Sequence, residues 1–231
     1  MRNFTKLVLV FALSSFTLFS CKDAAKETSK DDTTKKVEKK TDVEKKVEVV
    51  TQAGVLNANL ATEAEIASTG LSAEIVTQIL EKRPFLSMTE FEAVLGSENK
   101  EELYKKIFVP LNLNTTAEKD FKIIPGVGDR MAHEFEEYRP YTSVAQFKKE
   151  IGKYVDEKEV ARYLNYVFVP VELNTASEAD IKALPGVGNR MAHEFEEYRP
   201  YKNMAQFRKE ISKYVDDKEL SRLERLVYLK K

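Results

Sequence analysis

The chain has 231 residues, which is room for one or two ordinary domains. Hydrophobic residues make up 42% and charged residues 32%, a balance typical of a soluble globular protein with a polar excess. The formal net charge is −1, so the composition excludes a protein that attracts nucleic acid through a strong overall positive charge.

Residues 1–20 are predicted to be a secretory signal. Arg2 and Lys6 supply its positive start, and the apolar run over 7–19 is shorter than the roughly 20 residues that cross a bilayer. The run ends in Leu-Phe-Ser before Cys21, which resembles the lipobox of bacterial lipoproteins, where the cysteine is acylated. We therefore expect a lipid on Cys21.

A lipid on Cys21 implies attachment to a membrane outside the cytoplasm, in the bacterial cell envelope, either periplasmic or surface-exposed. Two alternatives stay open: an uncleaved N-terminal anchor, and an ordinary signal followed by an incidental cysteine. Cys21 is the single cysteine of the chain, so the lipidated protein would have neither a free thiol nor a disulfide.

Residues 21–54 are predicted to be a flexible charged tether. After the cysteine this stretch is rich in Lys, Glu, Asp and Thr and contains no aromatic residue. Such a sequence cannot bury enough apolar surface to offset the entropy lost on ordering.

From residue 55 onward the sequence repeats itself, which predicts three tandem units. The units are residues 55–110, 111–170 and 171–231. The second and third units align without a gap, and the stretch at 130–141 recurs unchanged at 190–201. The first unit keeps an Arg-Pro and a Phe-Val-Pro landmark but has lost the hairpin sequence, so we expect it to be degenerate.

The sequence Pro-Gly-Val-Gly, at 125–128 and 185–188, predicts a tight turn between two helices. Proline fixes one φ, and glycine can take the positive φ that other residues avoid. Because Gly126 and Gly128 have no Cβ, the N–H groups of the turn are open to an anion. The next helix adds its own unpaired N–H groups and the positive end of its dipole.

Local signals predict four short helices in each unit. In the third unit we expect a capping box from Thr175 to Glu178 to start the first helix. Asn189, like Asp129 in the second unit, is expected to cap the second helix. No alternating pattern is long enough to predict a sheet. The predicted core residues of the last three helices are Met191, Phe195, Tyr198, Met204, Phe207, Ile211, Leu220, Leu223 and Leu226.

This order of segments resembles the helix-hairpin-helix motif and, more narrowly, the ComEA-like competence family. That family has Leu-Asn-Thr-Ala, a short helix, a Leu-Pro-Gly-Ile-Gly hairpin, a second helix, Tyr-Arg and a phenylalanine. The resemblance implies an all-α fold of tandem helix-hairpin-helix repeats. The matching residues are Leu173 to Ala176, Leu184 to Gly188, Tyr198-Arg199 and Phe207 in the third unit, and Leu113 to Thr115, Ile124 to Gly128, Tyr138-Arg139 and Phe147 in the second.

In DNA-binding relatives the hairpin amides hold backbone phosphates, and a basic residue early in the second helix adds a charge. Phosphates carry no base information, so such binding is sequence-independent. The alternative is that Pro-Gly-Val-Gly is only a compact connector and that both arginines are solvated. The resemblance implies DNA contacts for Gly126, Val127, Gly128 and Arg130, and for Gly186, Val187, Gly188, Asn189 and Arg190.

The charge distribution opposes strong DNA binding. The first unit has five basic and nine acidic residues, the second has nine and ten, and residues 171–230 of the third have eleven of each. Asp129 is expected close to any phosphate on the second hairpin, whereas Asn189 is neutral, so the third unit is expected to contribute more. A second basic set would widen the DNA-facing surface, or is simply the solvated face of an amphipathic helix. Its residues are Lys148, Lys149, Lys153, Arg208, Lys209 and Lys213.

We expect no transition-metal site, no cofactor and no enzymatic activity. His133 and His193 are the only histidines, and glutamate stands four residues after each where a zinc helix needs a second histidine. A monovalent cation on the hairpin carbonyls stays compatible with the resemblance. No nucleophile–base arrangement and no mononucleotide-binding loop is present in the sequence.

Two hypotheses about function follow. The first is a membrane-anchored protein that binds double-stranded DNA without sequence preference, similar to a competence receptor in DNA uptake. The second is an envelope lipoprotein that uses the same fold for protein–protein interaction, as the extrinsic helix-hairpin-helix subunit of photosystem II does. A continuous positive strip joining the hairpins favours the first. Scattered charge with an exposed apolar patch favours the second.

Overall fold

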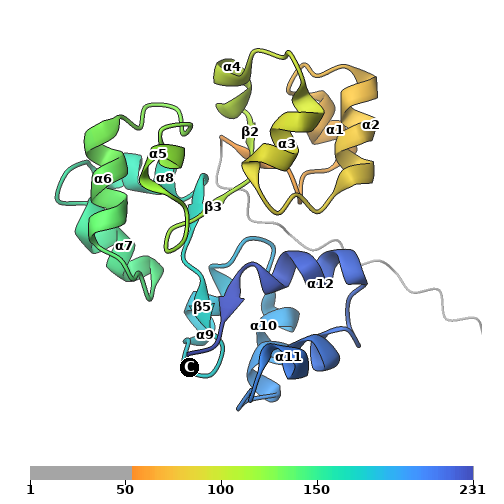
Figure 1. The fold of residues 1–231 in the computed structure, drawn as a ribbon, viewed down its shortest axis with the longest axis vertical. Helices are drawn as coiled ribbons and strands as arrows, with labels where there is room; N and C mark the ends of the chain where they lie inside the picture. Colours follow the sequence, from red (N-terminus) through yellow and green to blue (C-terminus); the bar gives the residue numbers. More distant parts are fainter. Residues whose placement is uncertain (1–53, 231) are drawn as a thin grey trace, which may run out of the picture. The chain divides into compact units, whose positions relative to one another are not determined.

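The structure is a computed structural model that describes residues 54–230. The predicted signal, Cys21 and the predicted tether up to residue 53 lie outside the described residues. The described chain is mostly helical, which confirms the predicted all-α fold (Figure 1). Within this part of the chain, no helix has the length and apolar character needed to cross a bilayer.

Twelve helices and six two-residue strands follow one another between residues 54 and 230. The helices are α1 (Glu63–Ala67), α2 (Ala73–Lys82), α3 (Met88–Leu95), α4 (Lys100–Tyr104), α5 (Glu118–Phe121), α6 (Asp129–Glu137), α7 (Val144–Ile151), α8 (Glu157–Tyr163), α9 (Glu178–Lys182), α10 (Asn189–Glu197), α11 (Met204–Ile211) and α12 (Asp217–Glu224). The strands are β1 (Leu56–Asn57), β2 (Ile107–Phe108), β3 (Leu111–Asn112), β4 (Val167–Phe168), β5 (Val171–Glu172) and β6 (Val227–Tyr228).

Each group of four helices lies between two strands that pair in parallel. β1 pairs with β2 around α1–α4, β3 with β4 around α5–α8, and β5 with β6 around α9–α12. The sequence predicted no sheet, and these short strands differ from that prediction. A two-residue strand is too short to show alternation, and its partner is distant in the chain, as in the pairing of Leu56 with Ile107.

The first helix of the third unit starts later than predicted. α9 begins at Glu178, and its N-cap is Ser177, whose hydroxyl accepts the Asp180 N–H at 3.1 Å. The predicted capping box from Thr175 to Glu178 is therefore wrong. Ser177 takes the place of the cap because it stands directly before the helix. The Thr175 hydroxyl instead donates to the Glu172 carboxylate at 2.7 Å.

The predicted core of the third unit packs inward. The rings of Phe195 on α10 and Phe207 on α11 meet edge to face, with centroids 5.1 Å apart. Edge-to-face pairs of this kind add to the burial of apolar area. Phe195, Phe207, Ile211, Leu220, Leu223 and Leu226 are buried, and Met191, Tyr198 and Met204 are partly buried against them.

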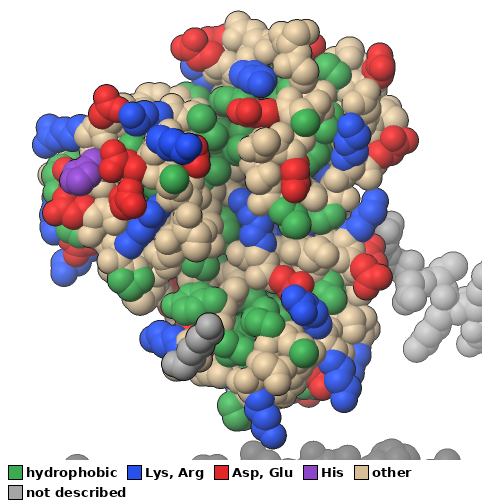
Figure 2. Space-filling view, in the orientation of Figure 1, with side chains coloured by type: hydrophobic (Ala, Val, Ile, Leu, Met, Phe, Trp, Pro, Cys, Tyr) green, Lys and Arg blue, Asp and Glu red, His purple; other side chains and the backbone are tan. Residues whose placement is uncertain are grey.

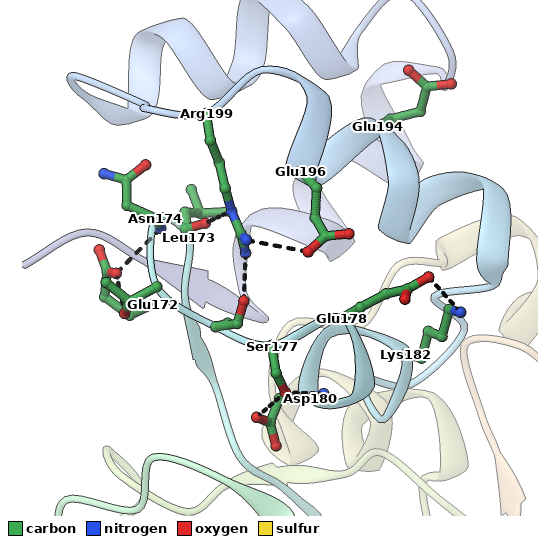
Figure 3. Close-up of polar contacts among 12 residues, drawn as sticks. Glu172, Leu173, Asn174, Ser177, Glu178, Asp180, Lys182, Glu194, Glu196 and Arg199 are labelled. Carbon is green, nitrogen blue, oxygen red and sulfur yellow. Dashed lines mark hydrogen bonds and ion pairs between the residues drawn. The ribbon is translucent and has the colours of Figure 1, made fainter.

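An asparagine and an arginine hold the backbone of the third unit together, and Figure 3 shows the contacts of the arginine, Arg199. Asn174 accepts the Tyr201 N–H at 2.7 Å and donates to the Tyr201 carbonyl at 3.0 Å. Arg199 donates to the carbonyl oxygens of Leu173 at 2.5 Å and Ala176 at 2.8 Å. These contacts fasten the segment before α9 to the segment after α10.

The same two contacts recur in the other units. Asn114 bonds both backbone groups of Tyr141, and Asn59 bonds both backbone groups of Phe85. Arg139 and Arg83 donate to carbonyl oxygens near the start of their own units. This asparagine and the Arg-Pro landmark of the sequence therefore hold the fold in all three units.

Candidate nucleic-acid interface

The two Pro-Gly-Val-Gly segments form tight turns, as the sequence predicted. Gly126 has φ +80° and Gly186 has φ +71°, a left-handed conformation that glycine takes without steric cost. Val127 and Val187 are buried and attach the turn to the core. Each valine N–H donates to the carbonyl oxygen three residues earlier, at 3.0 or 3.1 Å.

The helices that follow these turns begin without a side-chain cap. Gly128 and Gly188 are the N-caps of α6 and α10, in extended conformation. The prediction that Asp129 and Asn189 are the caps is wrong. Each is the first helical residue, because the glycine carbonyl already accepts the N–H four residues on, at 3.0 Å. The first three N–H groups of each helix thus have neither an intrahelical acceptor nor a capping side chain.

The first unit lacks this opening. Ser72 is the N-cap of α2, and its hydroxyl accepts the Ile75 N–H at 3.3 Å. Glu74 is the second helical residue there, the place that Arg130 and Arg190 take in α6 and α10. A capped start followed by a carboxylate does not favour an anion. The expected loss of a phosphate-ready turn in this unit agrees with the geometry.

Arg130 and Arg190 are exposed one residue into α6 and α10. Neither guanidinium forms an ion pair or a hydrogen bond with any residue between 54 and 230. Each lies over a tyrosine ring, with its central carbon 5.7 Å from the Tyr154 centroid and 5.9 Å from the Tyr214 centroid. No sequence pattern predicted this contact, because each tyrosine is far from its arginine along the chain.

The two hairpins differ in charge at the first helical residue. Asp129 forms an ion pair with Lys122, and this pair raises the pKa of the lysine. In the third unit Asn189 is neutral, and Lys182 pairs with Glu178 at 2.6 Å. The N-terminus of α10 therefore has no carboxylate at its first residue, whereas that of α6 has one.

Acidic neighbours compensate most of the second basic set. On the face drawn in Figure 2, Lys and Arg side chains are interspersed with Asp and Glu side chains. This face does not carry a continuous positive strip. The ion pairs are Lys149 and Lys153 with Glu150, Lys213 with Glu210, and Arg208 with Glu224.

The third hairpin has an arginine partner that the sequence analysis missed. Arg222 on α12 is 4% exposed and donates to the Pro185 carbonyl at 2.5 Å. It also pairs with Glu219 at 2.7 Å. The sequence hints at this residue only through the repeat, since Arg222 stands sixty residues after Arg162. This hairpin borders a groove of about 760 Å³, whose lining includes Lys148, Lys182, Gly186, Gly188 and Asn189.

The histidines do not gather metal ligands. Among residues 54–230 no three His, Cys, Asp or Glu side chains are placed to hold a metal ion together. His133 Nδ1 lies 3.3 Å from the Glu118 carboxylate, and this hydrogen bond raises the pKa of His133. His193 lies 3.7 Å from Glu197.

Comparison with known proteins gives one match, over the third unit. Residues 167–227 match the family described as the helix-hairpin-helix motif. The match runs from β4 to β6 and includes the hairpin before α10. No curated protein and no solved structure matches the chain. Helix-hairpin-helix motifs commonly bind nucleic acid, so this region is compatible with DNA binding.

Proposed function

We propose that the protein binds double-stranded DNA without sequence preference, with backbone phosphates on the N–H groups that open α6 and α10. The observation that carries the proposal is the uncapped start of both helices, each with an exposed arginine one residue further on. Helix N-termini of this kind attract phosphate through free donors and the helix dipole.

The arginines suit this role because a guanidinium can hold a phosphate through two N–H groups. Arg130 and Arg190 have no carboxylate partner among the described residues, so they bind phosphate without first breaking an ion pair. The Pro-Gly-Val-Gly turns carry no side chain able to read a base edge, which agrees with phosphate contacts at the turns themselves. In this proposal the first unit, with Ser72 and Glu74, does not contact DNA.

Charge limits the affinity. Removing Arg2 and Lys6 with the predicted signal leaves 35 of the 37 basic residues against 38 acidic ones. A net negative protein gains no long-range attraction from DNA. The contacts at the two hairpins must therefore act at short range, and the neutral Asn189 makes the third unit the stronger site.

We also propose a lipid anchor on Cys21 and a role in DNA uptake from outside the cell. The support is the signal-like sequence at 1–20 and the lipobox-like residues before Cys21. Mass spectrometry of the protein purified from membranes tests the anchor. A mature chain that starts at residue 21 and carries acyl mass agrees with it, and a chain without acyl mass contradicts it.

One observation favours the second hypothesis, an envelope protein that binds other proteins. The ion pairs within the second basic set leave little uncompensated positive charge beside the hairpins. Among residues 54–230, however, Leu86 is the single large apolar side chain classed as exposed, at 43%. No second exposed large apolar side chain is therefore present among these residues to anchor a protein partner, and we keep DNA binding as the preferred function.

The test measures binding of residues 22–231 to random duplex DNA across a salt series. Gly188→Asp places a carboxylate at the helix start, and Arg190→Glu reverses the guanidinium charge. Lys202→Glu is the matched control, since it makes the same charge change at an exposed lysine outside the hairpin.

Two hairpins with about two phosphate contacts each give a log–log salt slope of roughly −3 to −4. We expect that slope for the unchanged protein and for Lys202→Glu, with binding strongly reduced in both hairpin variants. Absence of binding at about 50 mM salt would overturn the DNA proposal, since electrostatic contacts are strongest at low salt. Equal losses in Lys202→Glu and Arg190→Glu would show that only net charge matters, and would remove the hairpin assignment.

A further inference from the structure

A pair of tyrosines lies behind the arginine of the second hairpin. The Arg130 guanidinium carbon is 5.7 Å from the centroid of the Tyr154 ring. The hydroxyls of Tyr154 and Tyr138 are 2.6 Å apart, so one donates to the other. Lys153 Nζ lies 4.8 Å from the centroid of the Tyr138 ring. Tyr154 follows α7, whereas Arg130 is at the start of α6, so the contact joins the two halves of the unit.

The third unit repeats this arrangement closely. The Arg190 guanidinium carbon is 5.9 Å from the Tyr214 centroid, and the hydroxyls of Tyr214 and Tyr198 are 2.7 Å apart. Lys213 Nζ is again 4.8 Å from its ring, that of Tyr198. The two rings of each pair are 6.4 Å apart in both units. The two copies thus hold one geometry.

A buried carboxylate supports each tyrosine pair. Glu134 and Glu194 are each 8% exposed, and one carboxylate oxygen of each has no hydrogen-bond partner among the described residues. The hydrogen bond to the second tyrosine first, and then the nearby glutamate, raise the pKa of Tyr154 and of Tyr214. Figure 3 shows Glu194 pointing away from the Arg199 cluster that holds the backbone. The Glu194 carboxylate therefore takes no part in the Arg199 contacts that hold the backbone.

The first unit shows that the fold does not require the arginine–tyrosine arrangement. It keeps the asparagine and arginine that hold the backbone, Asn59 and Arg83. It replaces the whole arginine–tyrosine arrangement together with the glycine hairpin. Counted from α2 and α3, the residues at the places of Arg130, Glu134, Tyr138, Lys153 and Tyr154 are Glu74, Gln78, Lys82, Ser97 and Glu98. A four-helix unit thus forms without the tyrosines, and they occur only beside an open hairpin.

We propose that Tyr154 and Tyr214 are positioning residues that hold Arg130 and Arg190 over the uncapped starts of α6 and α10, ready for a phosphate. A ring face attracts a guanidinium through its quadrupole and leaves the N–H edges of the guanidinium free to donate. A guanidinium already held in place loses less rotamer freedom when the phosphate arrives. This inference rests on the proposed function, because the ligand is the phosphate of that proposal. It assigns a role in binding to the turns that follow α7 and α11.

The first experiment needs no DNA. Proton NMR of residues 22–231 follows the δ protons of Arg190, which the Tyr214 ring beside the guanidinium is expected to shift upfield. We expect the shift in the unchanged protein and in Tyr214→Phe, which keeps the ring, and its loss in Tyr214→Leu. Arg190 δ protons with the same shift in Tyr214→Leu and in the unchanged protein overturn the inference, whatever the protein binds.

The second experiment is a double-mutant cycle on binding to random duplex DNA. We expect Tyr214→Leu to weaken binding about two- to fivefold when Arg190 is present, the value of an exposed cation–π contact, and to have no further effect in Arg190→Ala. Arg190→Ala itself reduces the salt slope by about one. Tyr214→Phe binds like the unchanged protein. The pair Arg130→Ala and Tyr154→Leu repeats the cycle in the second unit.

Three outcomes distinguish the possibilities. The positioning role is overturned if the losses of binding in Tyr214→Leu and Arg190→Ala multiply independently in the double variant. It is also overturned if Tyr214→Leu binds normally while Arg190→Ala does not. Both outcomes leave the DNA proposal intact. No binding by the unchanged protein overturns the proposed function itself, and the NMR result then decides the arginine–tyrosine contact alone. Urea denaturation of every variant shows whether a loss reflects unfolding, and Tyr154→Leu, the same change in the second unit, replaces Tyr214→Leu if the latter does not fold.

Discussion

Arg222 donates a hydrogen bond to the carbonyl oxygen of Pro185 at 2.5 Å and thereby binds the inside of the third hairpin. Its counterpart Arg162 pairs with Glu159 at 2.6 Å and makes no hydrogen bond to the second hairpin among the described residues. The two hairpins share their sequence from proline to glycine, yet only the third has its carbonyl held by a buried cation. Stability and binding should therefore respond differently in the two units.

Replacing Arg222 by methionine is expected to lower the free energy of unfolding by about 2 kcal/mol. The Pro185 carbonyl would lose its hydrogen-bond donor, and water cannot easily replace it because Arg222 is only 4% exposed. Arg162→Met is the matched control, and we expect it to lower the free energy of unfolding by less than about 1 kcal/mol. The Arg162 side chain is 31% exposed, so solvent screens its ion pair. Urea unfolding measures both. Equal losses in the two variants would show that the hairpin contact of Arg222 adds nothing.

Replacing Gly186 by alanine is expected to destabilise the protein more than replacing Gly126 by alanine. Both glycines have positive φ, which costs an alanine about 1–2 kcal/mol. At Gly186 the new Cβ would also meet Leu60 at 2.8 Å and Arg222 at 2.9 Å, whereas at Gly126 the nearest atom is on Arg162 at 3.3 Å. We expect Gly186→Ala to lower the free energy of unfolding, measured in urea, by about 2–4 kcal/mol. A smaller loss at Gly186 than at Gly126 would contradict the close approach of Leu60.

Exchange of the first helical residues should exchange the strengths of the two DNA sites. Asp129→Asn removes a carboxylate beside the start of α6 and frees Lys122 from its ion pair. We expect binding about two- to fivefold tighter at about 0.1 M salt. Asn189→Asp is the reciprocal variant and should weaken binding by a similar factor. Fluorescence anisotropy with duplex DNA measures both, and changes of the same sign in the two variants would refute this account of the charge.

The contact between His133 and Glu118 should make part of the stability depend on pH. The hydrogen bond raises the pKa of His133 in the folded protein above the unfolded value of about 6.5. The contact therefore stabilises the protein below the unfolded pKa, and its contribution is lost as the pH rises through the folded pKa.

NMR titration of the His133 ring is the measurement for this contact. We expect the midpoint to fall toward the ordinary value in Glu118→Gln, which removes the carboxylate and keeps the shape. Glu137→Gln is the control, since that carboxylate lies 3.8 Å from Nε2 and contributes less to the shift. An unchanged midpoint in Glu118→Gln would mean that the hydrogen bond is absent in solution.

Much of the fold follows from local signals in the sequence. The spacing of Met204, Phe207 and Ile211 predicts the buried face of α11, and the side chains pack as expected. The positive φ of Gly126 and Gly186 also follows from the sequence, because a Pro-Gly turn leaves few alternatives. Caps were less predictable: several Ser, Thr, Asn and Asp residues stand near each helix start, and only the direction of the incoming chain selects one of them.

The sequence by itself determined that the chain is helical, that its units repeat, and that two of the three hairpins are open to an anion. These properties depend on residue type and short spacing, which local backbone sterics translate directly into structure. Only the tertiary structure decided that Arg222 binds the third hairpin, that Tyr154 and Tyr214 lie under the two arginines, and that short strands close each unit. Those contacts join residues more than twenty positions apart, and their partners are chosen by packing of the helices, which no local pattern encodes.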